Sequence, residues 1–286
     1  MTLVSSKAPV LIGYMVFAMF AFAVCDVGIK MMGNTLPISQ ILFLMGSISG
    51  IFVGMGAIAR GKQIFDAKVF EPLFILRTLL EFIGGLAFIS AFVFGSLAIS
   101  SAILQAVPVV VALGGTWFFG QRVSIQQWLL ISAGLLGVMI ILSPWDASFQ
   151  PISLLAIVAV MCLAGRDLIM RGMGRKLDTG VVSFWAFAGT GLGGWLIQPW
   201  MGEWQPLNAE NWSWLALTVT TLILAYTAVV RATREGQVAV IAPFRYSRLL
   251  FAGLLAASIF GEPITASLLI GSALIVASGI LTLRQA

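Results

Sequence analysis

Histidine is absent from this sequence, and charged residues are scarce. Asp, Glu, Lys and Arg together make up only 9% of the 286 residues, while 60% are hydrophobic. Soluble globular chains are about a quarter charged, so this chain lacks the charge needed to cover a surface in contact with water. The mean hydropathy of +1.04 agrees with that interpretation. The sequence therefore predicts an integral membrane protein.

The missing residues and motifs also exclude several kinds of chemistry. Without histidine there is no Ser-His-Asp or Cys-His nucleophile, no H-E-x-x-H zinc site and no histidine proton relay. The two cysteines, Cys25 and Cys162, lie in apolar segments, which argues against a disulfide framework. Neither a phosphate-binding G-x-x-x-x-G-K-S/T motif nor a G-x-S-x-G nucleophile motif occurs. We therefore expect no metal, no cofactor and no catalytic residues.

Long apolar runs are abundant. A membrane-spanning helix needs about 20 mostly apolar residues, and the runs do not alternate in polarity as β-barrel strands do. The fold class predicted is an all-α integral membrane protein of ten transmembrane helices. The predicted segments are 9–31, 35–58, 70–94, 97–119, 124–143, 151–171, 178–200, 212–231, 238–260 and 264–283.

Lysine and arginine are distributed unevenly among the connections. With the amino terminus inside, eleven basic residues fall on the inner side and only Lys30 falls near the outer face. This distribution follows the positive-inside rule and predicts cytoplasmic termini in the inner (cytoplasmic) membrane. It also explains the net charge of +5 without nucleic acid as a partner. The inner basic residues are Lys7, Arg60, Lys62, Lys68, Arg122, Arg171, Arg175, Lys176, Arg231, Arg234 and Arg284.

The two halves of the chain resemble each other at a constant offset of 141 residues. Asp26 aligns with Asp167, Lys30 with Arg171, and Phe119-Gly120 with Phe260-Gly261. The prediction is two five-helix repeats, residues 1–143 and 144–286. Because five is odd, the second repeat enters the membrane from the opposite side. Inverted repeats of this kind are typical of transporters that work by alternating access.

Two stretches carry a resemblance to a known family. "FFGQRVSIQQWLLISAGLLGVMIIL" closes the first half and "IFGEPITASLLIGSALIVASGILTL" closes the second. Together with the five-plus-five pattern they resemble the EamA-type drug/metabolite transporters. "CDVGIK", "LR" at Leu76-Arg77 and "VIAPFRYSRLLFAG" resemble a bacterial branch of uptake carriers that includes riboflavin and S-adenosylmethionine transporters. The first half has Gln121 where the family usually has Glu, so Glu262 lacks its symmetry mate. Neither residue is assigned a transport role.

Eight ionisable residues fall within the predicted spans, where charge is costly and marks functional sites or partners. Five are basic and three acidic, so the interior carries a formal charge of +2. The predicted helix over 238–260 bears Arg245 and Arg248 on one face without an acid, and we expect them to contact an anion, with Tyr246 beside them. The eight are Asp26, Lys30, Arg77, Glu81, Arg166, Asp167, Arg245 and Arg248.

The remaining acids and bases pair by spacing. Arg77 and Glu81 are four residues apart, so they are either part of a substrate site or an intrahelical pair that makes insertion tolerable. Asp26 and Asp167 each have a base four residues on, Lys30 and Arg171. These groups, with Arg166, are predicted to act in outer and inner gates. The alternative is a set of helix-end ion pairs with no further role.

A few polar and aromatic residues complete the predicted substrate site. Pro108 and Pro243 interrupt two predicted helices, and Gln105 lies one turn before Pro108. Trp185 is a deep tryptophan that offers a stacking platform, although a deep aromatic is usually part of the core. Gly46, Gly50 and Gly54 form a small-residue face for close helix packing or, less simply, a dimer.

The function predicted from these features is secondary transport. A small zwitterionic or anionic metabolite, such as an amino acid, carboxylate, vitamin or nucleoside-like compound, would cross by alternating access through a monomer. The alternatives are an exporter of aromatic or cationic compounds in the same superfamily, a channel, or an intramembrane enzyme. An enzyme would need Asp26 and Asp167 as a dyad, and these are predicted at opposite depths. Transport coupling to protons, coupling to another ion, and exchange all remain open.

Overall fold

The computed structural model describes residues 8–119, 124–143, 145, 149–173, 177–235 and 241–285, and these residues form helices without strands. The first half contains α1 (Ala8–Met32), α2 (Ile38–Ile58), the short 3-10 helix η1 (Ala67–Phe70), α3 (Pro72–Val93), α4 (Leu97–Leu104), α5 (Val107–Phe119) and α6 (Ile125–Leu142). The second half contains η2 (Pro151–Ser153), α7 (Leu154–Met173), α8 (Thr179–Leu196), α9 (Gln198–Met201), α10 (Ala209–Glu235), η3 (Ala242–Tyr246), α12 (Ser247–Phe260) and α13 (Ala266–Gln285).

Length and hydropathy support six of the ten predicted spans among the described residues. Two further apolar helices, Trp128–Leu142 and Ala266–Leu281, are shorter. The ten-span topology itself stays a prediction. The six supported segments are Pro9–Met32, Ile38–Ile58, Pro72–Val93, Leu97–Gly115, Pro151–Met170 and Ala209–Ala232.

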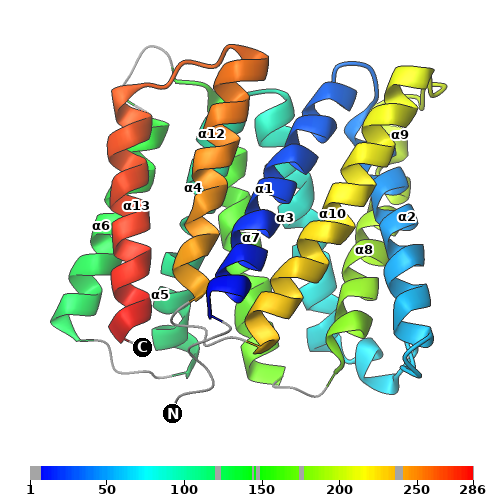
Figure 1. Cartoon of the computed structure of the whole chain (residues 1–286), viewed down its shortest axis with the longest axis horizontal. Coiled ribbons are helices and arrows are strands. Elements are labelled where there is room, and N and C mark those ends of the chain that lie inside the picture. The colour runs from blue at the N-terminus through cyan, green and yellow to red at the C-terminus, as the bar shows by residue number, and fades with distance from the viewer. Residues whose placement is uncertain are drawn as a thin grey trace.

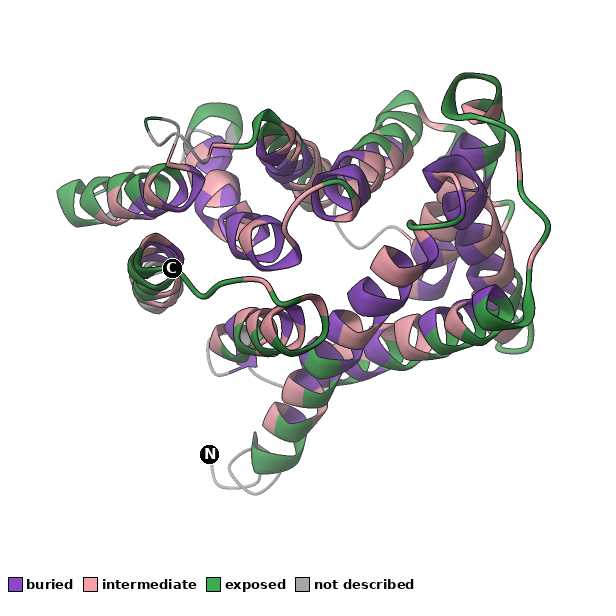
Figure 2. Cartoon of the chain, turned by 90° about the horizontal axis from the view of Figure 1, so that it is seen from above, coloured by how far each residue is buried: buried purple, intermediate pink, exposed green. Residues whose placement is uncertain are grey.

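The helices run side by side from the bottom to the top of Figure 1, and α1 begins at the end of the bundle where α13 ends. We call this the inner end and the opposite one the outer end, following the predicted topology. Viewed along the bundle, buried residues face other helices and exposed residues face the periphery (Figure 2). Many of the exposed side chains are large and apolar, such as Phe52, Leu129 and Leu250. An apolar periphery is the surface that a lipid bilayer solvates, and the chain is a multi-pass membrane protein.

The most extensive helix contacts each join one helix from the first half of the chain to one from the second. They pair α1 with α10, α2 with α8, α3 with α7, and α6 with α13. The two halves are therefore interleaved, and one continuous core of buried residues runs through both.

Both predicted proline interruptions are confirmed. The predicted helix over 97–119 divides into α4 and α5 just before Pro108, which has no N–H to donate to the Leu104 carbonyl. In the described part of the segment over 238–260, η3 contains Pro243 and precedes α12. The two interruptions touch, because the Gln105 amide nitrogen donates to the Arg245 carbonyl oxygen at 3.1 Å.

The small-residue face of α2 packs within the chain. A β-carbon placed on Gly46 would lie 2.4 Å from the backbone nitrogen of Gly191 in α8, and one on Gly54 would lie 2.7 Å from the Phe184 ring. Such close approach is possible only without a side chain. The predicted close-packing role is confirmed, and its partner is α8.

Candidate functional site

Four charged side chains form a network between α3 and α7. Glu81 accepts from Arg77 at 2.6 Å through Oε2, and from Arg166 at 2.5 Å through Oε1. Arg166 also contacts Asp167 Oδ1 through Nε at 2.9 Å and through Nη2 at 2.8 Å. The i,i+4 pair predicted from sequence is thus present, and Arg166 extends it to the other half of the chain. We call these four residues the α3–α7 network.

Arg77 is incompletely satisfied in this network. The residue is 5% exposed, and its Nε and Nη1 atoms are buried with no hydrogen-bond partner among the described residues. Leaving donors of a buried cation unpaired costs about 1–3 kcal/mol or more, so native structures rarely do so without reason. The α3–α7 network therefore retains donor capacity beyond its internal ion pairs.

Asp26 and Arg248 form a separate pair that connects α1 to α12. Arg248 Nη2 lies 2.6 Å from Asp26 Oδ2 and 2.9 Å from Oδ1. The guanidinium also lies 5.2 Å from the Phe22 ring centroid and 5.5 Å from that of Phe88, distances suited to cation–π attraction. The predicted Asp26–Lys30 pair is wrong, because Asp26 faces α12 and its charge is matched there. Arg248 consequently does not share an anion site with Arg245 in this structure.

Lys30 instead belongs to a cluster at the outer end. Its ammonium donates to Glu262 at 2.7 Å and to the Gly95 carbonyl at 2.8 Å. Glu262 also accepts from the Ser96 hydroxyl at 2.6 Å and from the backbone N–H groups of Leu97 and Ala98 at 2.8 and 2.9 Å. These N–H groups lie in the first turn of α4, where they have no partner inside the helix. We call this cluster, Lys30, Gly95, Ser96 and Glu262 with the start of α4, the outer clasp.

The pKa of Glu262 is lowered in the folded protein, and the residue pattern alone assigns Glu262 no role. Burial by itself raises the pKa of its carboxyl, but hydrogen bonds from Lys30, from Ser96 and from the α4 backbone favour the anion, so its pKa lies below the usual value. The sequence signal was the F-G-Q/E motif followed by a helix. That motif marks the turn before α13 but says nothing about the distant start of α4, 165 residues away.

Arg245 lies near the α3–α7 network without joining it. The residue is exposed, and it lies within Coulombic range of Arg166 and Asp167. No carboxylate among the described residues forms an ion pair with it. Gln105, predicted to reach the site, contacts the Arg245 backbone as described above. The structure therefore brings together Arg77, Glu81, Gln105, Arg166, Asp167 and Arg245 from the predicted set.

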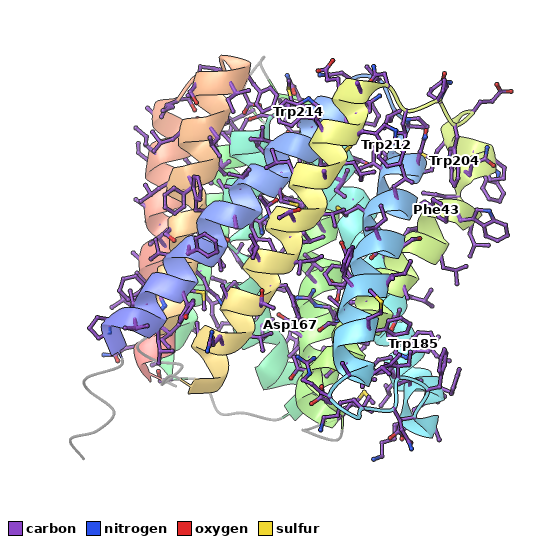
Figure 3. The ribbon with its side chains drawn as sticks, turned by 45° about the vertical axis from the view of Figure 1, so that its right-hand side comes forward. Phe43, Asp167, Trp185, Trp204, Trp212 and Trp214 are labelled. Atoms are coloured by element: carbon purple, nitrogen blue, oxygen red, sulfur yellow. The ribbon has the colours of Figure 1, made fainter. Side chains whose placement is uncertain are left out.

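Two predicted substrate contacts lie elsewhere. Tyr246 is 6% exposed, and its hydroxyl lies against Gly279 of α13, so closely that a β-carbon there would overlap it. Trp185 donates to the Ile64 carbonyl at 2.7 Å and makes edge contacts with Phe65 and Phe70 near the inner end (Figure 3). Both are packing residues in this structure. The side chain of Arg171, the predicted partner of Asp167, lies outside the described residues.

Two pockets among the described residues lie away from the α3–α7 network, and the smaller one, at the inner loop, is lined by Lys62, Asp66 and Asp178. A groove of about 410 Å³ lies between α2 and α8, with Phe43, Gly50, Phe184 and Trp195 among its lining residues. Its wall is apolar and lies away from the α3–α7 network. Among the described residues, no three His, Cys, Asp or Glu side chains gather as metal ligands do.

Comparisons with known proteins agree with this architecture. The chain is 22% identical to the pseudopaline exporter of Pseudomonas aeruginosa over 237 residues, covering 82% of each chain. It is 25% identical to a riboflavin transporter of Vibrio cholerae over 184 residues, covering 62% of this chain and 59% of that protein. It is 22% identical to an S-adenosylmethionine uptake transporter of Rickettsia bellii over 276 residues, covering 93% and 90%.

A solved crystal structure has the same fold. It superposes with a TM-score of 0.63 at 19% identity and covers 98% of both chains. The model of the EamA-like transporter family matches residues 10–143 and 150–284, which together span nearly the whole sequence. The chain is a membrane transporter, and it belongs to the EamA-like transporter family.

Proposed function

We propose that this protein is a secondary transporter of a small zwitterionic or anionic organic metabolite in the cytoplasmic membrane. The observation that carries the proposal is the α3–α7 network together with Arg245. These residues comprise three arginines and two carboxylates, a formal charge of +1, and two donors of Arg77 are unpaired. A positive interior with spare donors favours a ligand that brings a carboxylate or phosphate. It disfavours the cationic compounds among the alternative substrates.

The pairing of helices supports alternating access. If the halves are inverted repeats, a two-fold axis exchanges the first helix of each half, the second of each, and so on. The contacts of α1 with α10 and of α7 with α3 exchange under that operation, whereas α2–α8 and α6–α13 map onto themselves. Interleaved repeats of this kind rock against each other around a central site.

The outer clasp and the Asp26–Arg248 pair support a gating role. Each joins the first half of the chain to the second: Lys30 and the start of α4 to Glu262, and Asp26 to Arg248. Opening toward the outer side would have to separate these contacts. We further propose a monomer, since the glycine face of α2 is already occupied by α8.

Reconstitution in liposomes tests the proposal. Purified protein should give saturable uptake that is accelerated when the vesicles are preloaded with unlabelled substrate. The Arg166→Gln variant should lower the maximal rate by tenfold or more, because it removes the Arg166–Glu81 ion pair between α3 and α7. Lys62→Gln, at the exposed inner loop, is the matched control and should leave uptake unchanged. Chemical conversion of the substrate, or a non-saturating ionic conductance, would contradict the proposal.

A further inference from the structure

The connection between α2 and α3, residues 59–71, displays two large aromatic side chains at the inner end of the bundle. Phe65 is 66% exposed and Phe70 is 58% exposed. Both rings make edge contacts with Trp185 of α8, whose indole N–H donates to the Ile64 carbonyl at 2.7 Å (Figure 3). The two phenylalanines are therefore held against α8 while much of each ring remains uncovered.

The short helix η1 makes this connection amphipathic. Val69 is 2% exposed and packs with Phe74 of α3. The Asp66 side chain caps η1 by accepting from the Lys68 backbone N–H at 2.9 Å. With three residues per turn, neighbouring side chains of a 3-10 helix point about 120° apart. Val69 consequently faces the protein, and Phe70 faces outward.

Two bases on the same connection lack a carboxylate partner. Arg60 and Lys68 are both exposed, and neither forms an ion pair with another residue that the structure describes. Lys62 differs from them, because its ammonium lies 3.9 Å from Asp178 Oδ2. The connection therefore presents two unmatched positive charges beside its exposed aromatic rings.

The acids in this region each stand at the start of a helix. Asp66 is the N-cap residue of η1, Glu71 that of α3 and Asp178 that of α8. The N-terminal end of a helix carries a partial positive charge, which favours an acid there. The acids are thus partly neutralised by their own helices, whereas the two bases are not.

The combination of unmatched bases and uncovered rings fits one kind of partner. A soluble anion would satisfy the bases and leave the phenylalanines in water, and an apolar partner would do the reverse. A phospholipid has both parts. Aromatic rings favour the headgroup level of a bilayer, and each base near an anionic leaflet strengthens binding about fivefold.

An apolar path leads from this surface into the membrane. The ring centroids of Phe65 and Phe184 are 6.4 Å apart. Phe184 also lines the groove between α2 and α8, together with Gly50 and Ala188. A lipid with its headgroup at residues 59–71 can therefore place an acyl chain along Phe65 toward this groove.

We propose that residues 59–71 form a binding surface for anionic phospholipid of the inner leaflet. Arg60 and Lys68 contact the headgroup phosphates, and Phe65 and Phe70 lie among the acyl chains beneath them. The connection joins α2, which packs on α8, to α3, which packs on α7. Bound lipid therefore stabilises the inner ends of both helices. This assignment goes beyond the transport function and does not depend on the substrate.

Thermal unfolding of the full-length protein in detergent tests the assignment. The protein is titrated with phosphatidylglycerol, with phosphatidylcholine of the same acyl chains, or with soluble glycerol 3-phosphate. Phosphatidylglycerol should raise the unfolding midpoint in a saturable manner, at concentrations at least tenfold lower than phosphatidylcholine. Glycerol 3-phosphate should leave the midpoint unchanged, because it has no acyl chains to cover the phenylalanines.

Variants separate the two parts of the surface. Arg60→Gln combined with Lys68→Gln should raise the half-saturating phosphatidylglycerol concentration tenfold or more and leave the phosphatidylcholine response unchanged. Phe65→Ser combined with Phe70→Ser should weaken the response to both lipids. Lys62→Gln lies on the same connection, but its charge is already matched, so this control should respond as the wild type does. If the phenylalanine variant fails to fold, the charge variant and the three titrations decide.

Three outcomes would overturn the assignment. Equal responses to the two lipids would mean that the bilayer solvates this surface without headgroup recognition. A midpoint shift produced by glycerol 3-phosphate would assign the bases to a soluble phosphate. A dimer that Phe65→Ser and Phe70→Ser convert to a monomer would assign the surface to a second copy of the chain. None of these outcomes bears on the transport function, which uptake into liposomes measures separately.

Discussion

The outer clasp and the α3–α7 network each connect the two halves of the chain through a glutamate. They differ in whether the hydrogen-bonding groups around that glutamate are all paired. Glu262 receives the Lys30 ammonium, a hydroxyl and two backbone N–H groups, so its acceptor capacity is used fully. Glu81 receives two arginines, and one of them, Arg77, keeps two buried donors unpaired. A saturated cluster stabilises one arrangement of helices, whereas an unsaturated one retains affinity for something further.

The environments explain the difference. The outer clasp uses the start of α4, whose free N–H groups already favour an anion and require no side-chain ordering. The α3–α7 network lies among apolar helix faces, where every donor and acceptor must be brought by another side chain. Glu262 is thus held largely by groups at the start of a helix, whereas Glu81 is held by side chains alone, Arg77 from its own helix and Arg166 from α7.

The substitution Glu81→Gln should lower the stability of the protein more than any other substitution in either cluster. It leaves Arg77 and Arg166 facing each other without the anion between them, and breaking a buried pair in this way costs about 3–5 kcal/mol. Thermal unfolding of the purified protein in detergent should show a large drop in midpoint. Glu203→Gln, on the exposed outer loop, serves as the control. A midpoint within the error of the wild type would mean that the α3–α7 network does not hold α3 to α7.

Glu262→Gln should have a smaller effect on stability. The remaining oxygen can accept from the Ser96 hydroxyl and the Ala98 N–H group, but an amide nitrogen in place of Oε1 cannot accept from Lys30 or from the Leu97 N–H group. We therefore expect a cost of about 1.5–3 kcal/mol. Its effect on the outer end should be specific. A cysteine introduced at Phe94, an exposed position beside Gly95, should react faster with a membrane-impermeant maleimide supplied from outside. Unchanged labelling would contradict a closing role for the outer clasp.

Acidification should diminish the contribution of the outer clasp to the stability of the folded protein. The folded-state pKa of Glu262 lies below its unfolded value, so its stabilisation is fully present above the unfolded pKa, about 4.3. That stabilisation is lost as the pH falls through the folded pKa. The difference in unfolding midpoint between the wild type and Glu262→Gln should therefore be constant from pH 7 to pH 5 and shrink below about pH 4. A difference that grows on acidification would contradict the assigned direction.

An exposed ion pair should contribute least to the stability of the protein. Lys62 and Asp178 lie 3.9 Å apart at the inner end, and the Lys62 side chain is 46% exposed. Solvent screening reduces such pairs to about 0–1 kcal/mol. Lys62→Gln should therefore shift the unfolding midpoint by less than either glutamate variant. A shift as large as that of Glu262→Gln would show that burial does not determine how strongly each ion pair affects the unfolding midpoint.

Hydropathy and spacing predicted much of the fold. Apolar runs located the helices, and proline predicted where the helices over 97–119 and 238–260 break, because a missing N–H acts locally. The Gly46-Gly50-Gly54 face was also recognised from spacing alone. The number of spans and the repeat boundaries remain predictions, since α6 and α13 have apolar cores shorter than an ordinary span.

The candidate site was harder to predict, for a physical reason. Arg77–Glu81 is local, four residues apart, and spacing reveals such a pair. Asp26–Arg248 joins residues 222 positions apart, and helical spacing favoured the wrong partner, Lys30. Position along the chain pointed to Tyr246, beside Arg245, and to Trp185, a deep tryptophan. Tyr246 is instead buried, and Trp185 packs against Phe65 and Phe70. Only the rotation of each helix about its own axis separates a packing aromatic from one that lines a site, and spacing does not specify that rotation.

The contact of Gly46 with Gly191 has a mechanical consequence. The two backbones touch with no side chain between them, and each belongs to a different half of the chain. If the halves rock, no side chains lie between α2 and α8 that could rearrange to let them slide. The two helices therefore rotate about this contact. The glycine face is then the pivot of the motion, and the charged clusters at other depths are displaced as the two halves rotate.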